Sequence, residues 1–244
     1  MSADTRFLAA EGLHNLRDVG GYPTAGGGRI RAGLLLRGGA LGELTTAAHP
    51  MLLELGLRTV IDLREDKELV GLPDSVLPDG LALHRNPLYR GRIRLGEIDD
   101  LAELYTQILE RCADQVVAAI EVLAGEGALP ALVHCSAGKD RTGLIVGVLL
   151  SALGVPDDVV AVDYARSEEA YVGELRERTM RKGIALGARE DRMEELMSCP
   201  PELMHAVLAD LRTAHGSAEG YLVAGGLRAE SLAALRERMV ERAS

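Results

Sequence analysis

A cysteine and an arginine separated by five residues carry the clearest chemistry in this chain of 244 residues. Cys135 and Arg141 enclose a short loop, whose other members are Ser136, Ala137, Gly138, Lys139 and Asp140. An apolar run at 131–133 precedes the loop and predicts a buried strand, and a longer one at 144–153 predicts a buried helix. Backbone N–H groups at a helix N-terminus bind anions, and the field there favours a thiolate. The spacing therefore predicts a thiolate nucleophile inside an anion-binding loop.

The chemistry that suits this loop is hydrolysis of a phosphate ester. Cys135 is expected to attack phosphorus in line, which gives a phosphocysteine intermediate that water then hydrolyses. Arg141 offers a planar, two-pronged grip on phosphate oxygens, and the amides of residues 136–141 hold the equatorial oxygens. An ordinary buried cysteine beside a surface arginine is the alternative. The agreement of spacing, glycines and strand-to-helix context argues against it.

The loop and further segments resemble a known family. Residues 134–143 are similar to the signature loop of the cysteine-dependent protein tyrosine phosphatase superfamily, and the run Gly-Lys-Asp-Arg-Thr-Gly resembles its bacterial tyrosine and lipid phosphatase branch. The resemblance covers about residues 12–170. It implies an α/β phosphatase fold with a helical lid, and activity on phosphotyrosine, with phosphoserine, phosphothreonine or phosphoinositides as further substrates. The other matching segments are residues 15–21, 36–39 and 163–167, with a weaker one at 216–227.

The resemblance also assigns roles beside the nucleophile. His134 is implied to orient the loop and support the thiolate, and a purely structural, hydrogen-bonded histidine is the alternative. The hydroxyl of Thr142 is implied to bond the cysteine sulfur, and a role at the start of the helix is compatible with this. Lys139, one of only three lysines, adds positive charge where extra phosphates would sit, or is placed there incidentally. Arg17 and Asp18 are expected to brace the site.

A general acid is harder to place. Protonation of the leaving group requires a carboxylic acid above the loop, and the resemblance implies an aspartate shortly after a strand at 81–84. Residues 80–96 contain no carboxylate, and Arg90 lies near the implied position. Asp140 is therefore the first candidate, with an ion pair to a neighbouring arginine as its alternative role. The weaker candidates, at the end of another strand, are Glu65, Asp66 and Asp62, which is also expected to support the site.

The surrounding elements predict an α/β fold. Residues 58–63 form an apolar, β-branched strand, and residues 81–84 form another. Helices over 98–111 and 114–125 follow before the strand at 131–133. This alternation predicts a central, mostly parallel sheet flanked by helices, with the site at the carboxyl ends of the strands. Further predictions are a hairpin over 22–36 and a helix capped by Thr45 that runs to Leu55.

The C-terminal part, 157–244, is predicted to be helical, and the whole chain, 1–244, is expected to form a single domain. Residues 168–192 carry dense alternating charge and few apolar side chains. They are expected to form an exposed helical lid, over about 168–200, or else a plain solvent-facing helix. Two prolines after Cys199 end this segment, and another helix follows.

Composition and charge limit the cellular partners. No run of 18 apolar residues appears, so no transmembrane segment is expected, and the N-terminus lacks a basic region followed by an apolar block. Three well-separated cysteines suit a reducing compartment, so a cytoplasmic location is expected, with export without a cleavable signal peptide as the alternative. A net charge of −10 argues against binding to nucleic acid. No metal-ligand spacing is visible, and no metal or cofactor is expected.

Four clustered arginines stand out against the negative net charge: Arg85, Arg90, Arg92 and Arg94. They form either a basic rim that attracts a polyanionic substrate or a solvated loop. The expected partners are a phosphorylated protein or a phosphoinositide as substrate, with inorganic phosphate as product. Two other functions stay open: a catalytically silent phosphate-binding module, because the acid is missing, and a sulfur-transferring rhodanese, which the arginine and threonine at this spacing disfavour.

Overall fold

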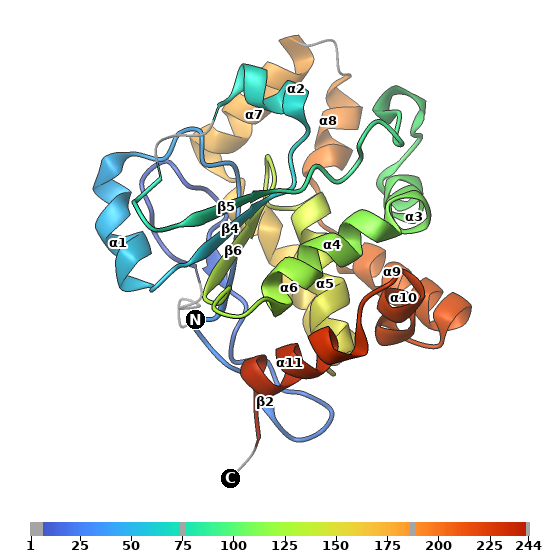
Figure 1. Ribbon diagram of the computed structural model, residues 1–244. Coiled ribbons are helices and arrows are strands. Elements are labelled where there is room, and N and C mark those ends of the chain that lie inside the picture. Colours follow the sequence, from blue (N-terminus) through green and yellow to red (C-terminus); the bar gives the residue numbers. More distant parts are fainter. Residues whose placement is uncertain (1–6, 74–76, 186–188, 243–244) are drawn as a thin grey trace.

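Five short strands form the central sheet of the computed structural model, which describes residues 7–73, 77–185 and 189–242. The order across the sheet is β1-β3-β6-β4-β5, and β1 runs antiparallel to β3 while the other neighbours are parallel (Figure 1). The mostly parallel sheet expected from the alternation of strands and helices is confirmed. The strands are β1 (Arg17–Asp18), β3 (Leu35–Gly38), β4 (Thr59–Asp62), β5 (Ala82–Arg85) and β6 (Ala131–His134).

Helices cover both faces of this sheet, because successive side chains on a strand point to opposite faces. Leu36, Val60 and Leu132 pack in one buried cluster with Leu52 of α1 (His49–Glu54). The adjacent residue of each strand joins a larger cluster on the opposite face. The helices on that face are α3 (Leu101–Arg111), α4 (Ala113–Ala124), α5 (Asp140–Ala152), α6 (Asp157–Ala165), α9 (Pro201–His215), α10 (Ala218–Ala224) and α11 (Ala229–Met239).

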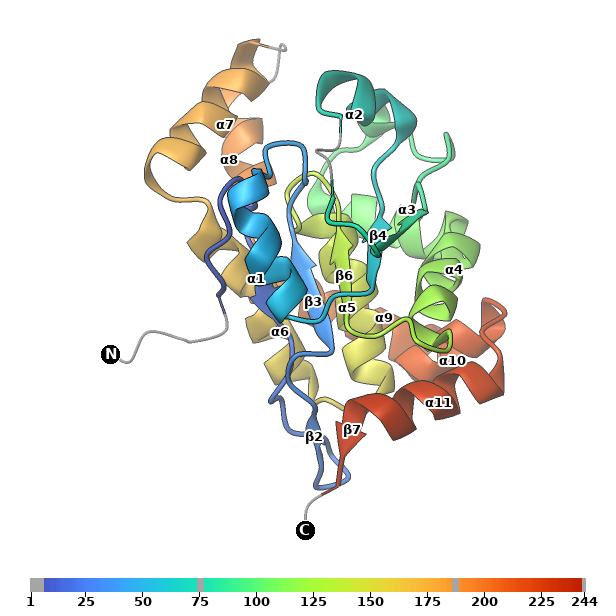
Figure 2. The ribbon, with the colours of Figure 1, turned by 60° about the vertical axis from the view of Figure 1, so that its left-hand side comes forward.

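Three further helices lie above the carboxyl ends of the parallel strands. They are α2 (Asp66–Gly71), α7 (Gly173–Ala185) and α8 (Glu190–Met197), and both ribbon views show them on this side of the sheet (Figures 1 and 2). The turn from β6 into α5 also opens there. The fold therefore brings the cysteine loop and these three helices to one end of the molecule.

Local structure differs from the sequence expectations in three places. The hairpin expected over 22–36 is shorter, because residues 21–24 pair with residues 28–30 through backbone hydrogen bonds and a bridge between Pro23 and Arg29. The other edge of β2 (Arg29–Ile30) pairs with β7 (Val240–Glu241). Thr45 makes no side-chain cap, since a 3-10 turn precedes α1. The charged segment is not one helix: a 3-10 turn (Arg166–Ala170) leads into α7 and α8. Another 3-10 turn spans Leu95–Glu97.

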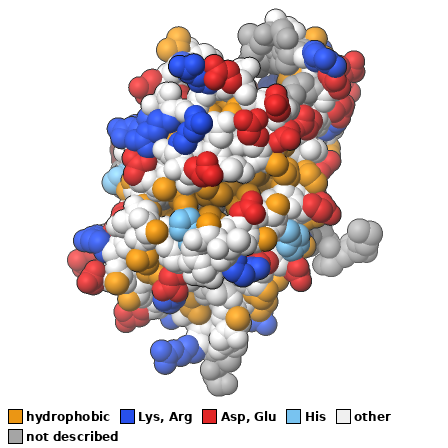
Figure 3. Space-filling view, turned by 90° about the vertical axis from the view of Figure 1, so that its right-hand side faces the viewer, with side chains coloured by type: hydrophobic (Ala, Val, Ile, Leu, Met, Phe, Trp, Pro, Cys, Tyr) orange, Lys and Arg blue, Asp and Glu red, His pale blue; other side chains and the backbone are white. Residues whose placement is uncertain are grey.

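The surface of the described residues carries mixed charge. Figure 3 shows acidic and basic side chains gathered in separate groups around a band of hydrophobic ones, on the face that carries α3, α9 and α10. No helix in the described ranges is long and apolar enough to cross a membrane. Within the same ranges, no group of histidine, cysteine and acidic side chains could hold a metal ion.

Candidate active site

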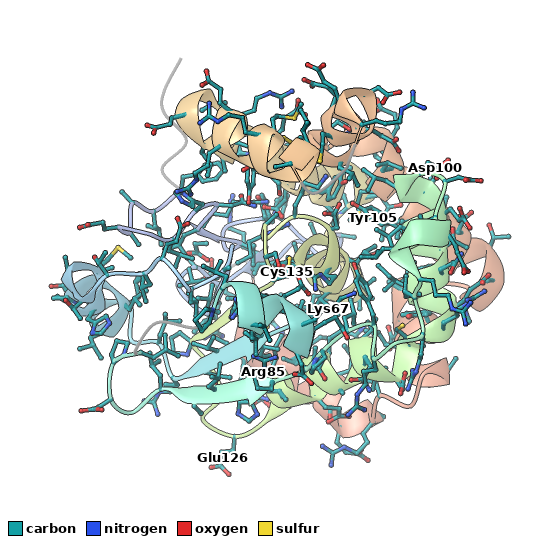
Figure 4. All side chains as sticks on the ribbon, turned by 90° about the horizontal axis from the view of Figure 1, so that it is seen from above. Lys67, Arg85, Asp100, Tyr105, Glu126 and Cys135 are labelled. Carbon is teal, nitrogen blue, oxygen red and sulfur yellow. The ribbon has the colours of Figure 1, made fainter. Side chains whose placement is uncertain are left out.

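The candidate nucleophile, Cys135, lies at the carboxyl end of β6, near the middle of the sheet. Cys135 directly follows β6 and is 2% exposed, and α5 begins five residues later at Asp140. Seen from above, Cys135 lies between α2 and the pair α7–α8 (Figure 4). The backbone N–H groups of residues 136–139 donate to no acceptor in the described part of the chain. They are therefore free to bind an anion.

Two buried side chains hold the carbonyl groups of this loop. Asn15 donates from Nδ2 to the carbonyl oxygens of Ala137, at 3.1 Å, and Gly138, at 3.0 Å. Arg37 donates from Nη2 to the carbonyl oxygens of Gly138, at 2.9 Å, and Lys139, at 3.3 Å. The N–H and C=O groups of a peptide unit point in opposite directions. Because Asn15 and Arg37 hold the carbonyl groups, the N–H groups of the loop point away from these two side chains. The pair thus shapes the loop for an anion.

Glycine is required at the centre of the loop. Gly138 has a φ of 66°, and a Cβ there would lie 2.3 Å from the carbonyl of Gly38 on the neighbouring strand β3. A larger residue would strain the backbone and push the loop off the sheet. The close approach is what lets Arg37 reach the loop carbonyls.

Asp163 neutralises part of the positive charge beneath the loop. Its carboxylate pairs with Arg17 at 3.1 Å and with Arg37 at 2.6 Å, and all three side chains are buried. Burial alone raises the pKa of Asp163, but the charges of both arginines and the hydrogen bonds from Arg17 and Tyr22 lower this pKa to about 2. Two guanidinium groups share one carboxylate, so a net positive charge lies behind the anion site.

Arg141 is held by a glutamate that sequence reasoning did not find. Glu68, on α2, accepts from Nη1 at 2.6 Å and from Nη2 at 2.8 Å, and it also accepts from the hydroxyl of Ser136. The guanidinium lies over the ring of Tyr89, with Cζ 5.1 Å from the ring centroid. Burial raises the pKa of Glu68, but its contacts with Arg141 and Ser136 lower it to about 2.

The pair with Glu68 leaves Nε of the Arg141 guanidinium unused. A guanidinium has five N–H donors in a planar fork. Besides Glu68, Nη1 of Arg141 donates to the carbonyl oxygen of Leu63 at 3.4 Å and Nη2 donates to the hydroxyl of Ser136 at 3.3 Å, whereas Nε has no acceptor among the described residues. Nε can therefore bind a phosphate oxygen while Glu68 keeps its hold on the two Nη groups.

Asp140 is anchored through one carboxylate oxygen. Its Oδ1 accepts from the hydroxyl of Tyr105 at 2.6 Å and lies 3.2 Å from Nζ of Lys139. Burial raises the pKa of Tyr105 well above its ordinary value, so this hydroxyl keeps its proton and donates. The expected alternative, an ion pair with an arginine, is not what the structure shows, because the cation beside Asp140 is a lysine.

Lys139 differs from the sequence expectation. Its ammonium donates to the carbonyl oxygens of Leu196, at 2.6 Å, and Ser198, at 2.8 Å, at the C-terminal end of α8. The side chain is buried and faces this helix end, where a cation is favoured by the unpaired carbonyls. The expected position beside the substrate is therefore corrected: in this arrangement Lys139 joins the loop to α8.

The residues expected to support the site divide into two groups. Arg17 lies in the charge cluster beneath the loop, whereas Asp18 accepts from the amides of Gly20 and Gly33 and folds the turn between β1 and β3. Nδ1 of His134 lies 3.4 Å from the carbonyl oxygen of Cys135, so this ring is close to the candidate nucleophile.

The weaker acid candidates are occupied elsewhere. Asp62 is fully buried and pairs with Arg64 at 2.9 Å and Arg85 at 3.1 Å, so it can support β4 but cannot reach a substrate. Glu65 accepts from the amides of Tyr89 and Arg90. Asp66 is almost fully exposed and pairs with Arg85.

Two other expectations are not met in this arrangement. The hydroxyl of Thr142 is buried and has no hydrogen-bond partner among the described residues, so the implied bond to the cysteine sulfur is not formed. Three of the four clustered arginines are paired with carboxylates: Arg85 with Asp62 and Asp66, Arg92 with Asp114, and Arg94 with Glu97. Their paired charges weaken the basic rim that their spacing predicted.

Helices α7 and α8 contact the loop directly. The hydroxyl of Tyr171, just before α7, donates to the carbonyl oxygen of Ala137 at 2.9 Å. Tyr171 also forms a small buried cluster with Met193 and Met197 of α8, against which Ala137 packs. The segment between α6 and α9 therefore covers one side of the cysteine loop.

Comparison with known proteins decides the family. A model of the tyrosine phosphatase family matches residues 8–241. The chain belongs to the tyrosine phosphatase family. It is 31% identical over 228 residues to a tyrosine-protein phosphatase of Nostoc commune, covering 86% of this chain and 75% of that protein. It is 32% identical over 201 residues to the triple specificity protein phosphatase PtpB of Mycobacterium tuberculosis, covering 68% and 71% of the two chains.

One solved structure is a more distant match. The crystal structure of P. aeruginosa TpbA aligns with 70% of this chain and 90% of its own, at 18% identity and a TM-score of 0.38. The family match and the two relatives identify the chain as a tyrosine phosphatase that hydrolyses phosphotyrosine. They lend no support to a catalytically silent module.

Family membership also marks residues that spacing alone did not. Asn15, Arg37 and Asp163 lie in the segments that resemble the family, so their positions were visible in the sequence, but their contacts with the loop were not. Glu68 and Tyr105 lie outside those short segments and carried no separate signal.

Proposed function

We propose that this tyrosine phosphatase works through a phosphocysteine on Cys135. The observation that carries the proposal is the set of unpaired loop amides around Cys135, with Arg141 held beside them by Glu68. The thiolate attacks phosphorus, the bond from phosphorus to the tyrosine oxygen breaks, and that oxygen takes a proton. Water then attacks the phosphocysteine, which releases inorganic phosphate and restores the thiolate.

Asp140 supplies the proton in this proposal. Tyr105 and Lys139 hold its Oδ1, whereas its Oδ2 has no partner among the described residues. The free oxygen can carry a proton to the leaving group and take one from the attacking water in the second step. The loop amides of Ser136, Ala137 and Gly138, together with Arg141, hold the equatorial oxygens, and His134, Arg17 and Asp62 support the surrounding backbone.

The segment at 168–200 acts as a lid in the same proposal. The contacts of Tyr171 with Ala137 and of Lys139 with the end of α8 support this role. The main buried cluster contains residues from Val19 to Met239, which supports one domain with the lid attached to it. The three cysteines are buried and unpaired, which supports a reducing, cytoplasmic location.

Further phosphate esters are a second, narrower proposal. A relative is named a triple specificity phosphatase, and we extend the proposed substrates to phosphoserine, phosphothreonine and phosphoinositides on that basis. Lys139 would contribute to such substrates only after α8 releases its ammonium. A panel of phosphopeptides and phosphoinositides, assayed by phosphate release, ranks these classes.

The nucleophile is tested by Cys135→Ser. The variant should lose turnover of a phosphotyrosine peptide and still bind phosphate or vanadate, because the loop amides and Arg141 remain. Cys112→Ser is the matched control, since Cys112 is also buried and unpaired but lies at the end of α3. We expect parent-like turnover from this control. Turnover by Cys135→Ser within tenfold of the parent would remove Cys135 as nucleophile.

A further inference from the structure

Two adjoining hollows lie beside the cysteine loop, between the N-terminal segment, the loop after β3 and helix α7. The inner hollow has a volume of about 330 Å³, and its wall includes Ser136 and Ala137, which directly follow the nucleophile. The outer hollow has a volume of about 420 Å³ and shares His14, Glu43 and Arg178 with the inner one. Figure 2 shows α7 above the N-terminal segment, and residues of both line the hollows.

The floor of the groove is held at a fixed place relative to the loop. The amide of Ala40 donates to the carbonyl oxygen of Ser136 at 3.0 Å, and the amide of Gly39 donates to that of His14 at 2.8 Å. Gly12 has a φ of 78°, and a Cβ there would lie 1.7 Å from the carbonyl oxygen of Glu43. Only glycine allows this contact. The groove is therefore a built continuation of the phosphate site.

The two hollows differ in chemistry. The inner one is lined largely by apolar side chains, namely Ala40, Leu72, Ala137, Tyr171 and Leu175. The outer one carries three carboxylates, from Glu11, Glu43 and Glu174. Arg178 pairs with Glu43 at 2.8 Å, at the junction of the hollows, and so offsets one of these charges. Glu11 and Glu174 have no ionic partner among the described residues, so the outer hollow keeps a negative potential.

We propose that this groove binds the polypeptide that flanks the phosphotyrosine. The inner hollow takes an apolar side chain close to the phosphotyrosine, and the outer hollow takes a lysine or arginine further along the same peptide. The proposal rests on the proposed function, because the loop around Cys135 must hold the phosphate. The substrate is then a phosphotyrosine in a polypeptide segment with one apolar and one basic neighbour. The headgroup of a phosphoinositide alone would leave the groove empty.

The substrate side is tested with phosphotyrosine peptides. An alanine-flanked reference peptide is compared with peptides in which leucine is moved through the three positions on either side. At one position, leucine should raise kcat/KM about tenfold, as expected for burial of a larger apolar side chain. A lysine placed beyond that leucine should raise kcat/KM further, and a glutamate at the same position should lower kcat/KM. Equal kcat/KM for all peptides would overturn the proposal.

The enzyme side is tested by Glu11→Lys with Glu174→Lys, both at exposed positions. The double variant should lose the preference for lysine over glutamate by about tenfold, while turnover of p-nitrophenyl phosphate and of the reference peptide stays unchanged. Glu177→Lys is the matched control on α7, because Glu177 pairs with Arg181 and does not line the groove. If Glu177→Lys loses the preference for lysine over glutamate to the same extent, the proposal is overturned.

Further outcomes separate this inference from the proposed function. No turnover of the reference peptide would refute the proposed function itself. Normal turnover with no sequence preference would refute the groove alone. If the parent enzyme prefers long-chain phosphoinositides and the double variant loses this preference, the groove binds a lipid. That result would overturn the proposal that the groove binds a peptide. Values of kcat/KM that change with enzyme concentration would show that the groove binds a second copy of the chain, and would overturn the proposal.

Discussion

Asp140 and Glu68 are two carboxylates with different contacts at the same loop. Glu68 has both oxygens on Arg141, and its pKa of about 2 keeps it charged throughout the neutral range. Asp140 has one oxygen held by Tyr105 and Lys139 and the other without a partner in the described ranges. A proton donor needs an oxygen that the protein does not already occupy. The contacts therefore favour Asp140 as the acid.

Asp140→Asn tests this assignment by leaving-group dependence. The variant should slow phenyl phosphate about 10²–10⁴-fold, because a poor leaving group needs the proton, and should slow p-nitrophenyl phosphate far less. Steady-state kcat values on both substrates measure the contrast. A loss of the same size on both would show that Asp140 maintains the shape of the loop.

Among the individual residues of the candidate site, the sequence predicted those that lie close together in the chain. Cys135 and Arg141 lie in one loop, so their spacing alone predicts an anion site. Asn15, Arg37 and Glu68 reach that loop from distant segments, and asparagine, arginine and glutamate are common surface residues. Their roles depend on which strands become neighbours in the sheet, and no local sequence pattern predicts these neighbours.

Helix α2 is the element that places Arg141. The first turn of α2 is fixed by a reciprocal capping box, in which Glu65 and Glu68 each bind the other's backbone amide. The same Glu65 carboxylate accepts from the amides of Tyr89 and Arg90 in the loop after β5. One helix start thus links that loop to the guanidinium, and a movement of α2 would carry Arg141 with it.

Glu68→Ala should lower kcat/KM on a phosphotyrosine peptide by about 10²-fold, because the guanidinium loses the partner that sets its orientation. Glu68→Gln should lose less, since it keeps an acceptor oxygen. Asp66→Ala, on the exposed side of the same helix, is the control and should behave as the parent. An increase of kcat/KM in Glu68→Ala would mean that the carboxylate competes with the substrate instead.

Elements with strong local signals were predicted well, and elements that depend on distant pairing were not. The strands β4 and β6 contain apolar or β-branched residues before a turn, and both fall where expected. The hairpin expected over 22–36 forms only over residues 21–30, and the pairing of Arg29 and Ile30 with Glu241 and Val240 on their other edge was not predicted. Dense charge predicted an exposed helix at 168–192, but it gave no sign of the break between α7 and α8.

For the whole molecule, Asp163 is the point where three segments meet. It joins Arg17 of β1, Arg37 of β3 and, through a hydrogen bond, Tyr22, while lying on α6. Loss of its carboxylate would leave two buried guanidinium groups without their counterion. Such changes are costly, because an unpaired buried charge is poorly solvated.

Asp163→Asn should lower the free energy of unfolding at pH 7 by about 3–5 kcal/mol. The pKa of Asp163 is about 2 in the folded protein, below its ordinary value of 3.8. Its stabilisation is therefore complete above pH 4 and is lost as pH falls towards 2. The difference between parent and variant should shrink by roughly 2 kcal/mol over that window. Urea denaturation at a series of pH values measures both effects.

The control for this prediction is Asp158→Asn on the same helix. Asp158 is almost fully exposed and should change the free energy of unfolding by less than about 0.5 kcal/mol. A pH-independent difference between the parent and Asp163→Asn would show that the carboxylate is not the titrating group that stabilises the cluster.

The pairing of β2 with β7 has a consequence for how the chain folds during synthesis. Ile30 is buried, yet its strand partner is Val240, near the opposite end of the polypeptide. While a ribosome is still making the last helices, β2 is paired only with residues 21–24, and the edge that later binds β7 stays open. Closing so long a loop is slow compared with local helix formation. The nascent chain must therefore protect this edge of β2 from pairing with other strands until β7 has been synthesised.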